Sequence, residues 1–299
     1  MRGEILDFLK VHDVKYKENI NLSAISPIRI GGRGDIVAYP DEESKLVDLM
    51  LFLRKMEISH KIVGRMSNLL PMDENYNGIV VRTDLLKRCE LYGNLFTASA
   101  GAMLISCANI LYQNGLSGFE GLAGIPGSIG GALVGNAGAF GCEICDTLVD
   151  LKVLDINDGT VRNIPRQDCG FSYRHSCLKQ GNYVIVSARF LLDRADKEKI
   201  RAQMDRCKEL RNKTQPKEPS LGSTFKRPDK DTFAAKLIDG CGLKGYRIGG
   251  AEISKLHAGF IVNIGGATAK DYIVLSEYAK KCVYEKYKIC LEREVEIMR

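Results

Sequence analysis

Three short stretches combine side chains that can do chemistry with residues that favour turns. They are Tyr173-Arg174-His175-Ser176, Gly222-Ser223-Thr224-Phe225-Lys226 and the terminal carboxylates Glu292, Glu294 and Glu296. An arginine pairs with a carboxylate through its planar fork, a serine hydroxyl hands over a proton, and a glutamate stabilises charge or returns a proton. Together these residue types predict a site that binds an anion and protonates it.

A serine nucleophile is a poorer interpretation of the same residues. Gly222-Ser223 lacks the G-x-S-x-G elbow, and none of the four histidines stands in a recognisable triad setting. Taken singly, each candidate has a structural explanation: a serine in a turn, an arginine at the surface, a solvated glutamate face. Only their combination with a glycine-rich stretch favours the functional interpretation.

That stretch runs from Gly121 to Gly141 and holds eight glycines and no charged residue. Exposed amide N–H groups in tight turns form concave nests that hold phosphate oxygens, so the segment predicts a pyrophosphate-bearing cofactor. A packing loop without a ligand is the alternative, whereas Pro126, Asn136 and the glycines make a poor membrane span. Neither G-x-G-x-x-G after a strand nor a P-loop is present, so the phosphate site belongs to another fold.

Around these residues the pattern predicts two α/β lobes and a third region. The first lobe contains a helix at 5–11, a helix after Asp41 with Leu46, Leu49, Met50 and Leu53 at helical spacing, and strands at 35–39, 61–64 and 78–81. The second, mainly β, contains strands at 89–98 and 183–192, a helix at 101–113 and a hairpin, 151–155 with 160–162, around Asp158-Gly159.

The third region follows a charged helix centred on 195–211. It contains a helix at 232–239, a strand at 260–264, a helix that begins at the capping box Thr268/Asp271 and ends near Tyr287, and a last strand at 289–297. We therefore expect an α+β protein with a domain at 1–195, made of lobes 1–86 and 87–195, and a second domain at 196–299.

Composition excludes several classes. A chain of 299 residues with 45% hydrophobic residues can bury a substantial core, and a net charge of +6 without a dense basic tract favours anionic small molecules over nucleic acid. The N-terminus lacks a secretory signal, so we expect the cytosol, no membrane association and ten reduced cysteines. Cys142 and Cys145 lack a second ligand pair, so a metal site is not expected.

The motifs, in order and spacing from about Gly115 to the end, resemble the UDP-N-acetylenolpyruvoylglucosamine reductases of bacterial cell-wall synthesis. The match rests on the three stretches above and on further runs: Gly124-Ile125-Pro126-Gly127, Gly130-Gly131-Ala132, Asn136-Ala137-Gly138-Ala139, Gln215-Pro216, Gly242-Leu243-Lys244-Gly245, Gly249-Gly250-Ala251, His257-Ala258-Gly259-Phe260-Ile261-Val262-Asn263, Ala267-Thr268-Ala269-Lys270-Asp271 and Leu291-Glu292-Arg293-Glu294-Val295. A chance match of that extent is implausible.

The resemblance implies an FAD-binding fold of the vanillyl-alcohol-oxidase type in two lobes, with a smaller substrate domain of the family's shorter type, which lacks a substrate-covering insertion. NADPH and FAD would reduce the enolpyruvyl group of the UDP-sugar to the lactyl ether of UDP-N-acetylmuramate. By resemblance, Ser223 protonates the substrate carbon, Arg174 and Glu294 stabilise the enol, and Tyr173, Lys217 and Arg227 contact substrate. The implied FAD residues are Arg29, Gly64, Arg65, Met66, Ser67, Asn68, Gly124, Ile125, Gly127, Ser128, Gly130, Gly131, Asn136 and Gly138. A monomer or weak oligomer is expected.

The first lobe departs from the family pattern. Ser26-Pro27-Ile28-Arg29 replaces the usual Asn-Thr before Arg/Lys-Ile-Gly-Gly, and Gly64-Arg65-Met66-Ser67-Asn68 replaces a glycine-rich run. The side chains at 65 and 66 either crowd the flavin pyrophosphate or, for Arg65, pair with it. Two alternatives thus stay open: a flavin-free nucleotide-sugar-binding or regulatory paralogue, and an FAD oxidoreductase of similar fold with another substrate.

Overall fold

The computed structural model describes residues 2–298, which divide into two compact units. The first unit contains the chain up to Glu18, Ile36–Arg65 and Gly78–Leu210, and the second contains Asn19–Asp35, Met66–Asn77 and the chain from Arg211 onward. The predicted domains divide the chain once, near residue 195, whereas the two early segments pack with C-terminal residues. The assignment of flavin and substrate to domains stays a prediction.

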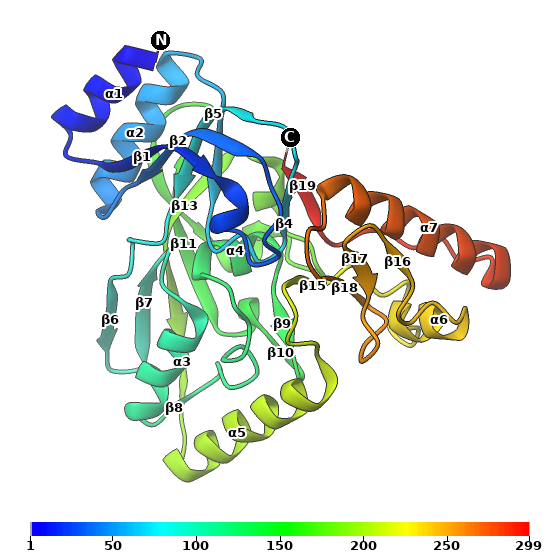
Figure 1. Ribbon diagram of the computed structural model, residues 1–299. Helices are drawn as coiled ribbons and strands as arrows, with labels where there is room; N and C mark the ends of the chain where they lie inside the picture. The colour runs from blue at the N-terminus through cyan, green and yellow to red at the C-terminus, as the bar shows by residue number, and fades with distance from the viewer. Residues whose placement is uncertain (1, 299) are drawn as a thin grey trace. The chain divides into compact units, whose positions relative to one another are not determined.

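A four-stranded sheet opens the first unit (Figure 1). Its strand order is β1 (Lys15–Asn21), β2 (Arg33–Tyr39), β5 (Tyr76–Arg82) and β3 (His60–Val63), with β3 parallel to β5. Helices α1 (Arg2–Val11) and α2 (Glu43–Lys55) share its core, and the predicted apolar face of α2 is confirmed because all four of its residues are buried. Sheet and helices come from the range 1–86 that was predicted as the first lobe, although Asn19–Asp35 and Met66–Asn77 of that range belong to the second unit.

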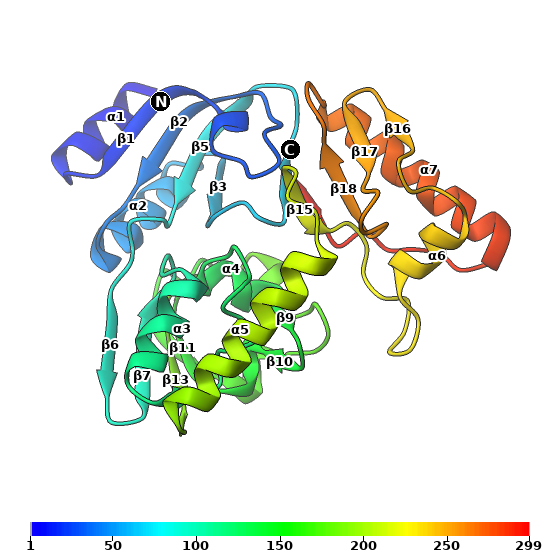
Figure 2. The same cartoon turned by 60° about the horizontal axis from the view of Figure 1, so that its bottom comes forward.

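The first unit also contains an antiparallel five-stranded sheet. Its order is β12 (Val161–Pro165), β11 (Leu148–Asp155), β13 (Tyr183–Leu191), β7 (Leu95–Ser99) and β6 (Cys89–Tyr92). One face packs on α3 (Leu104–Gln113) and α4 (Ile129–Val134), as Figure 2 shows, around the edge-to-face rings of Phe96, Phe119 and Phe190. The other face carries polar side chains, as the period of two in a strand requires.

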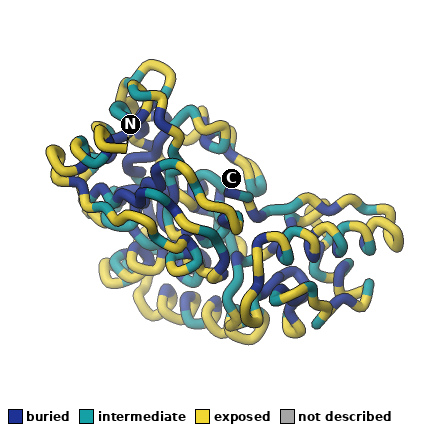
Figure 3. The backbone as a smooth tube through the Cα atoms, turned by 45° about the horizontal axis from the view of Figure 1, so that its top comes forward, coloured by how far each residue is buried: buried dark blue, intermediate teal, exposed yellow. Residues whose placement is uncertain are grey.

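Short elements and one long helix complete the first unit's connections. They are β8 (Leu116–Ser117) paired with β14 (Asp193–Arg194), β9 (Gly138–Ala139) paired with β10 (Cys142–Glu143), the 3₁₀ turns η2 (Ile144–Asp146), η3 (Arg166–Cys169) and η4 (Cys177–Gln180), and α5 (Lys197–Thr214), which runs into the second unit. Exposed and buried stretches alternate along the surface helices (Figure 3).

The second unit is built on the antiparallel sheet β15 (Ser220–Ser223), β18 (Phe260–Asn263), β17 (Ala251–Ile253) and β16 (Arg247–Ile248). Helices α6 (Ala234–Gly240) and α7 (Ala269–Tyr287) pack beside it, with η1 (Leu22–Ala24) and the parallel pair β4 (Leu69–Pro71) and β19 (Glu296–Met298). The capping box of Thr268 and Asp271 is confirmed at the start of α7, and Asp73 also accepts hydrogen bonds from the helix's first N–H groups.

Two predicted strands are wrong in extent. The segment 89–98 is a hairpin, because Gly93 adopts a left-handed φ of 61° and turns the chain between β6 and β7. The segment 289–297 is regular only from Glu296, because residues before it bond singly to neighbouring loops. Strand β1 was not predicted, since its sequence KYKENIN has no buried residue and therefore no apolar alternation. Within residues 2–298, no helix is long and apolar enough to cross a membrane.

Candidate active site

The glycine-rich stretch is fixed to the segment before α3 by backbone hydrogen bonds. The N–H of Leu104 donates to Gly127, and the N–H groups of Ile129 and Gly130 donate to the carbonyls of Ala102 and Ala100 at 2.9 and 2.8 Å. Gly127 and Gly130 are buried, whereas Gly124 and Ile125 are half-buried and Gly131 is exposed on α4. The loop therefore has one side packed on the sheet and one side open.

Gly64, which follows β3, lies against Ser128 of this loop. A Cβ built at residue 64 would stand 2.3 Å from Ser128 Oγ, so only glycine fits without a shift. The contact brings the start of the first predicted phosphate loop against the second loop within the first unit. Ser128 is 2% exposed, and its hydroxyl has no hydrogen-bond partner among the described residues.

Asn136, at the far end of the glycine stretch, is fully buried with a left-handed φ of 42°. Its Nδ2 donates to Glu143 Oε2 at 2.8 Å and to the Ser172 carbonyl at 3.1 Å, while Oδ1 has no partner among residues 2–298. Buried polar atoms normally find partners, and no described residue supplies one for Ser128 Oγ or Asn136 Oδ1.

Arg174 is held beside the same loop by its backbone and its guanidinium. The paired N–H to carbonyl bonds of Ser172 and His175, both 3.1 Å, form a tight turn in which Arg174 has φ of 54°. Its guanidinium donates to the carbonyls of Asn136 and Gly138 at 3.5 and 3.3 Å and lies over the half-buried Tyr173 ring. The arginine motif and the glycine motif therefore form one cluster.

Arg65 is turned toward acidic groups of its own unit. Its Nη1 lies 3.6 Å from Asp84 Oδ2, which also pairs with Arg82. Asp84 Oδ1 is buried and has no hydrogen-bond partner among the described atoms. Burial raises the pKa of the nearby Tyr39 phenol, whereas the Arg65 side chain itself is exposed.

In the second unit, Ser223 and Glu294 lie on adjacent backbones. The N–H of Glu294 donates to the carbonyl of Thr224, the residue after Ser223, at 2.9 Å. Asn68 Nδ2 donates to the carbonyl of Glu294 at 3.1 Å, and the Asn68 carbonyl accepts the N–H of Glu296 at 3.0 Å. The predicted proton donor, the predicted carboxylate and the end of the first phosphate loop thus come together, although 226 residues separate Asn68 from Glu294.

The three terminal carboxylates differ in their surroundings. Glu294 is half-buried, whereas Glu292 and Glu296 are exposed. Glu292 pairs with Lys226 of the serine motif, and the Lys226 N–H donates to the Glu292 carbonyl at 2.9 Å. The row of carboxylates therefore supplies one half-buried acid beside Ser223 and one ion pair that holds the two segments together.

The remaining predicted residues of the second unit lie at its surface or in its loops. Arg29 and Met66 have left-handed φ values of 59° and 56°; Arg29 is exposed, Met66 is buried and Ser67 half-buried. Lys217 is exposed after α5, and the exposed Arg227 lies over the Phe233 ring. Met66 is turned into the protein, so its side chain does not stand open at the loop surface.

Sequence reasoning missed the groups that fix these side chains. Glu143 orients the amide of Asn136, Asp84 pairs with Arg65, and Thr224 bridges Ser223 and Glu294. Thr224 lies inside the serine motif and Glu143 follows the glycine-rich stretch, so the motifs pointed to both positions. No motif pointed to Asp84, because its partner Arg65 is 19 residues away in the sequence.

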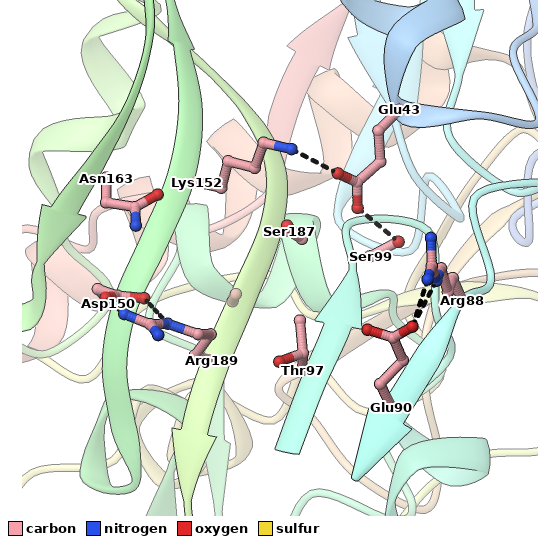
Figure 4. A pocket seen from close by; sticks show the side chains of 11 residues that line it. Glu43, Arg88, Glu90, Thr97, Ser99, Asp150, Lys152, Asn163, Ser187 and Arg189 are labelled. Carbon is pink, nitrogen blue, oxygen red and sulfur yellow. Dashed lines mark hydrogen bonds and ion pairs between the residues drawn. The ribbon is translucent and has the colours of Figure 1, made fainter. Parts of the chain in front are cut away.

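A separate cavity of about 290 Å³ lies on the polar face of the five-stranded sheet (Figure 4). Its charges satisfy one another in three pairs: Asp150 with Arg189, Glu43 with Lys152 and Glu90 with Arg88. Because each charge already has a partner and no predicted site residue lines it, this cavity is not the candidate active site.

All ten cysteines carry free thiols. Burial raises the pKa values of Cys142 and Cys145, so both favour the neutral thiol. Sulfur and carboxylate atoms of Cys145, Glu143 and Asp146 lie within 4.8 Å of one another, but Glu143 is already bonded to Asn136 and to the η2 backbone. These contacts explain the acidic side chains as structural.

Comparison with known proteins gives consistent matches over the whole chain. Residues 34–165 match the family model of an FAD binding domain, and residues 215–298 match that of the UDP-N-acetylenolpyruvoylglucosamine reductase C-terminal domain. Two reductases of that name from Streptococcus pneumoniae strains are 40% identical over 299 residues, which is 100% of this chain and 98% of theirs.

Solved structures agree. The UDP-N-acetylenolpyruvylglucosamine reductase of Thermus caldophilus aligns with a TM-score of 0.81 at 32% identity, over 96% of this chain and 99% of that one. Berberine bridge enzyme from Eschscholzia californica aligns with a TM-score of 0.51 at 15% identity, over 64% of this chain and 44% of its own. At that identity the second match shows a shared fold alone.

Proposed function

The chain belongs to the UDP-N-acetylenolpyruvoylglucosamine reductase family, and we propose that Arg174, Ser223 and Glu294 carry its chemistry. It is an FAD-dependent enzyme that uses NADPH to reduce the enolpyruvyl group of UDP-N-acetylenolpyruvoylglucosamine, giving UDP-N-acetylmuramate for peptidoglycan synthesis. Its fold is the FAD-binding fold of the vanillyl-alcohol-oxidase type with a smaller C-terminal region. The similarity over the full chain argues against both alternatives left open by the sequence.

The residues present fit FAD. Gly64 packs directly against Ser128 and leaves no room for a side chain, and among the described residues Ser128 Oγ and Asn136 Oδ1 are buried polar atoms without partners. We propose that the loop residues 64–68, with Arg29 and the glycine-stretch residues 124, 125, 127, 128, 130, 131, 136 and 138, hold the cofactor. When bound, FAD supplies the hydride that NADPH provides. Arg65, already near Asp84, is an added cation for the pyrophosphate.

The protein groups handle charge and protons on the substrate. Addition of hydride to the enolpyruvyl double bond places negative charge on the carboxylate side as an enolate. The fixed guanidinium of Arg174 stabilises that charge, since it is a permanent cation held in place by carbonyls. The hydroxyl of Ser223 then donates a proton to the carbon, and Glu294, on the adjacent backbone, stabilises the enol form.

The proposal also includes the residues that contact the substrate, the cellular compartment and the oligomeric state. Tyr173, next to Arg174, and the exposed cations Lys217 and Arg227 are the groups assigned to the anionic UDP-sugar. We assign the enzyme to the cytosol as a monomer or weak oligomer, without nucleic-acid or membrane partners, because its substrates are charged small molecules. Light scattering at micromolar concentration measures the oligomeric state, and a stable dimer would contradict the monomer.

The observation that carries the function is the full-length family match, together with the buried hydroxyl of Ser128, which packs against Gly64 and has no partner among residues 2–298. Purified protein should be yellow, carry about one FAD per chain, and oxidise NADPH only when the enolpyruvyl sugar is added. Mass spectrometry of the product should show two added hydrogens. Colourless protein that FAD does not reconstitute, or substrate-independent NADPH oxidation alone, would overturn it.

A further inference from the structure

Thr224 is a polar residue in the core of the second unit, directly after Ser223. It is 1% exposed, yet its hydrogen-bonding groups are paired. Its N–H donates to the Gly259 carbonyl at 2.8 Å, and its carbonyl accepts the Glu294 N–H at 2.9 Å. Its Oγ1 accepts the Ile261 N–H and the Tyr272 O–H, both at 3.2 Å. One residue therefore ties the serine segment to the glutamate segment, to β18 and to α7.

Of these two partners of the Thr224 hydroxyl, Ile261 contributes its backbone and Tyr272 contributes its side chain. Tyr272 lies on the first turns of α7, which runs beside the sheet in Figure 1, and it is fully buried. Burial raises the pKa of its phenol above the usual range, so it stays a donor at any working pH. A buried donor and acceptor that bond to each other hold a single geometry, because any movement that separates them leaves both groups buried without a hydrogen bond.

This pair acts on the two residues assigned to the chemistry. The Thr224 peptide follows Ser223 and accepts the N–H of Glu294, so a rotation of Thr224 moves both backbones. The same chain of contacts continues to Asn68, whose side chain donates to the Glu294 carbonyl. A displacement of reacting groups by about 1 Å is enough to cost about 100-fold in rate.

We propose that the hydroxyl pair of Thr224 and Tyr272 positions Ser223 against Glu294 for the reduction. The two residues touch neither substrate nor flavin in this scheme, so they are positioning residues. The inference rests on the proposed function, in which Ser223 and Glu294 act on the substrate.

The test compares three variants of the FAD-loaded enzyme. Thr224→Val and Tyr272→Phe each remove one hydroxyl with little change of shape, and Thr224→Ser keeps the hydroxyl. We expect Val and Phe to slow oxidation of the reduced enzyme by the enolpyruvyl sugar by about 10- to 100-fold. Reduction by NADPH and the KM for the sugar should stay within about threefold, and Ser should restore most of the rate. The double variant should be no slower than the slower single variant, since the pair acts as one unit.

A matched control is Ser276→Ala, which removes another buried hydroxyl from α7, bonded to the Ile273 carbonyl at 2.8 Å. It should lower the unfolding midpoint without slowing the substrate step. A Thr224→Val enzyme with wild-type rates, or one slowed equally in both half-reactions, would overturn the inference, as would a Thr224→Ser enzyme as slow as Thr224→Val.

Ser223→Ala separates this inference from the proposed function. If Ser223→Ala slows the substrate step and Thr224→Val does not, the positioning role alone fails. If Ser223→Ala leaves the substrate step intact, the proposed function fails and the positioning role falls with it. Should Tyr272→Phe not fold, the Val and Ser variants at 224 still decide the question.

Discussion

At the scale of single residues, the contact between Gly64 and Ser128 is a steric constraint that joins the two predicted phosphate loops within the first unit. A Cβ at 64 would lie 2.3 Å from Ser128 Oγ, whereas a Cβ at Gly131 would lie 3.6 Å from it, which is an ordinary contact. The hydroxyl is the tip of a short side chain, so removing it removes the clash.

Gly64→Ala is therefore expected to destabilise the protein by about 1–3 kcal/mol, the usual cost of overpacking, and to weaken FAD binding. Adding Ser128→Ala should recover most of that stability, which a double-mutant cycle of urea unfolding measures. Gly131→Ala is the matched control and should cost nothing. Additive effects of Gly64→Ala and Ser128→Ala would show that the contact does not govern the loop.

At the scale of elements, helix α7 is fixed at its start by two acids from different parts of the chain. Asp271 completes the capping box with Thr268, and Asp73 accepts the N–H groups of Ala269 and Lys270 at 2.8 and 3.1 Å. The hydrogen bond from the Thr268 N–H lowers the pKa of Asp271 below its ordinary value. The charged form of Asp271 is therefore favoured in the folded state.

Asp271→Asn is expected to lower stability by about 1 kcal/mol at neutral pH, the usual value of a capping interaction. Because the folded pKa is lowered, this stabilisation is complete above the unfolded pKa of about 4 and is lost as pH falls through the folded pKa. The difference between wild type and variant, measured by denaturant unfolding, should shrink below about pH 4. A difference that is the same at pH 7 and pH 2.5 would contradict the cap.

Elements with local signals were predictable from the sequence, and those fixed by distant contacts were not. Three elements have a sequence pattern only a few residues long: the apolar spacing of α2, the Asp158-Gly159 hairpin and the Thr268 cap. All three are confirmed. Strand β1 and the segment before Glu296 depend on neighbours far along the chain. For the same reason no local pattern showed that Asp73 caps α7.

The candidate site was predictable to the extent that its residues stand in dense motifs. Arg174, Ser223, Glu294 and the glycine stretch follow from the residues and from the family resemblance. The groups that hold them were not predictable, since the fold alone brings Asn68 to Glu294 and Tyr272 to Thr224. A sequence motif indicates which group reacts. The orientation of that group depends on side chains that the tertiary structure places beside it.

At the scale of the whole molecule, the two units have separate hydrophobic cores. His257, in the second unit, accepts the N–H of Gly259 on Nδ1 at 3.1 Å, and burial lowers the pKa of its ring. Protonation removes that acceptor next to the carbonyl that holds Thr224.

The stability of the second unit should therefore fall as pH drops from the unfolded histidine pKa of about 6.5 through the lowered folded value. Urea unfolding between pH 8 and pH 5, followed by amide exchange of β18, measures this loss. His257→Asn, which keeps an acceptor but does not titrate, should abolish the pH dependence in that range. Stability that rises as pH falls from 7 to 5 would contradict the assignment.

The central claim is that Ser223 protonates the substrate carbon and takes no part in the reduction of the flavin by NADPH. Stopped-flow measurement of both half-reactions in Ser223→Ala tests it most directly, with flavin absorbance as the signal in each. We predict reduction by NADPH near the wild-type rate and oxidation by the enolpyruvyl sugar slowed about 10²–10⁴-fold, the usual contribution of a general acid. Equal slowing of both half-reactions, or a substrate step that keeps its rate, would contradict the account.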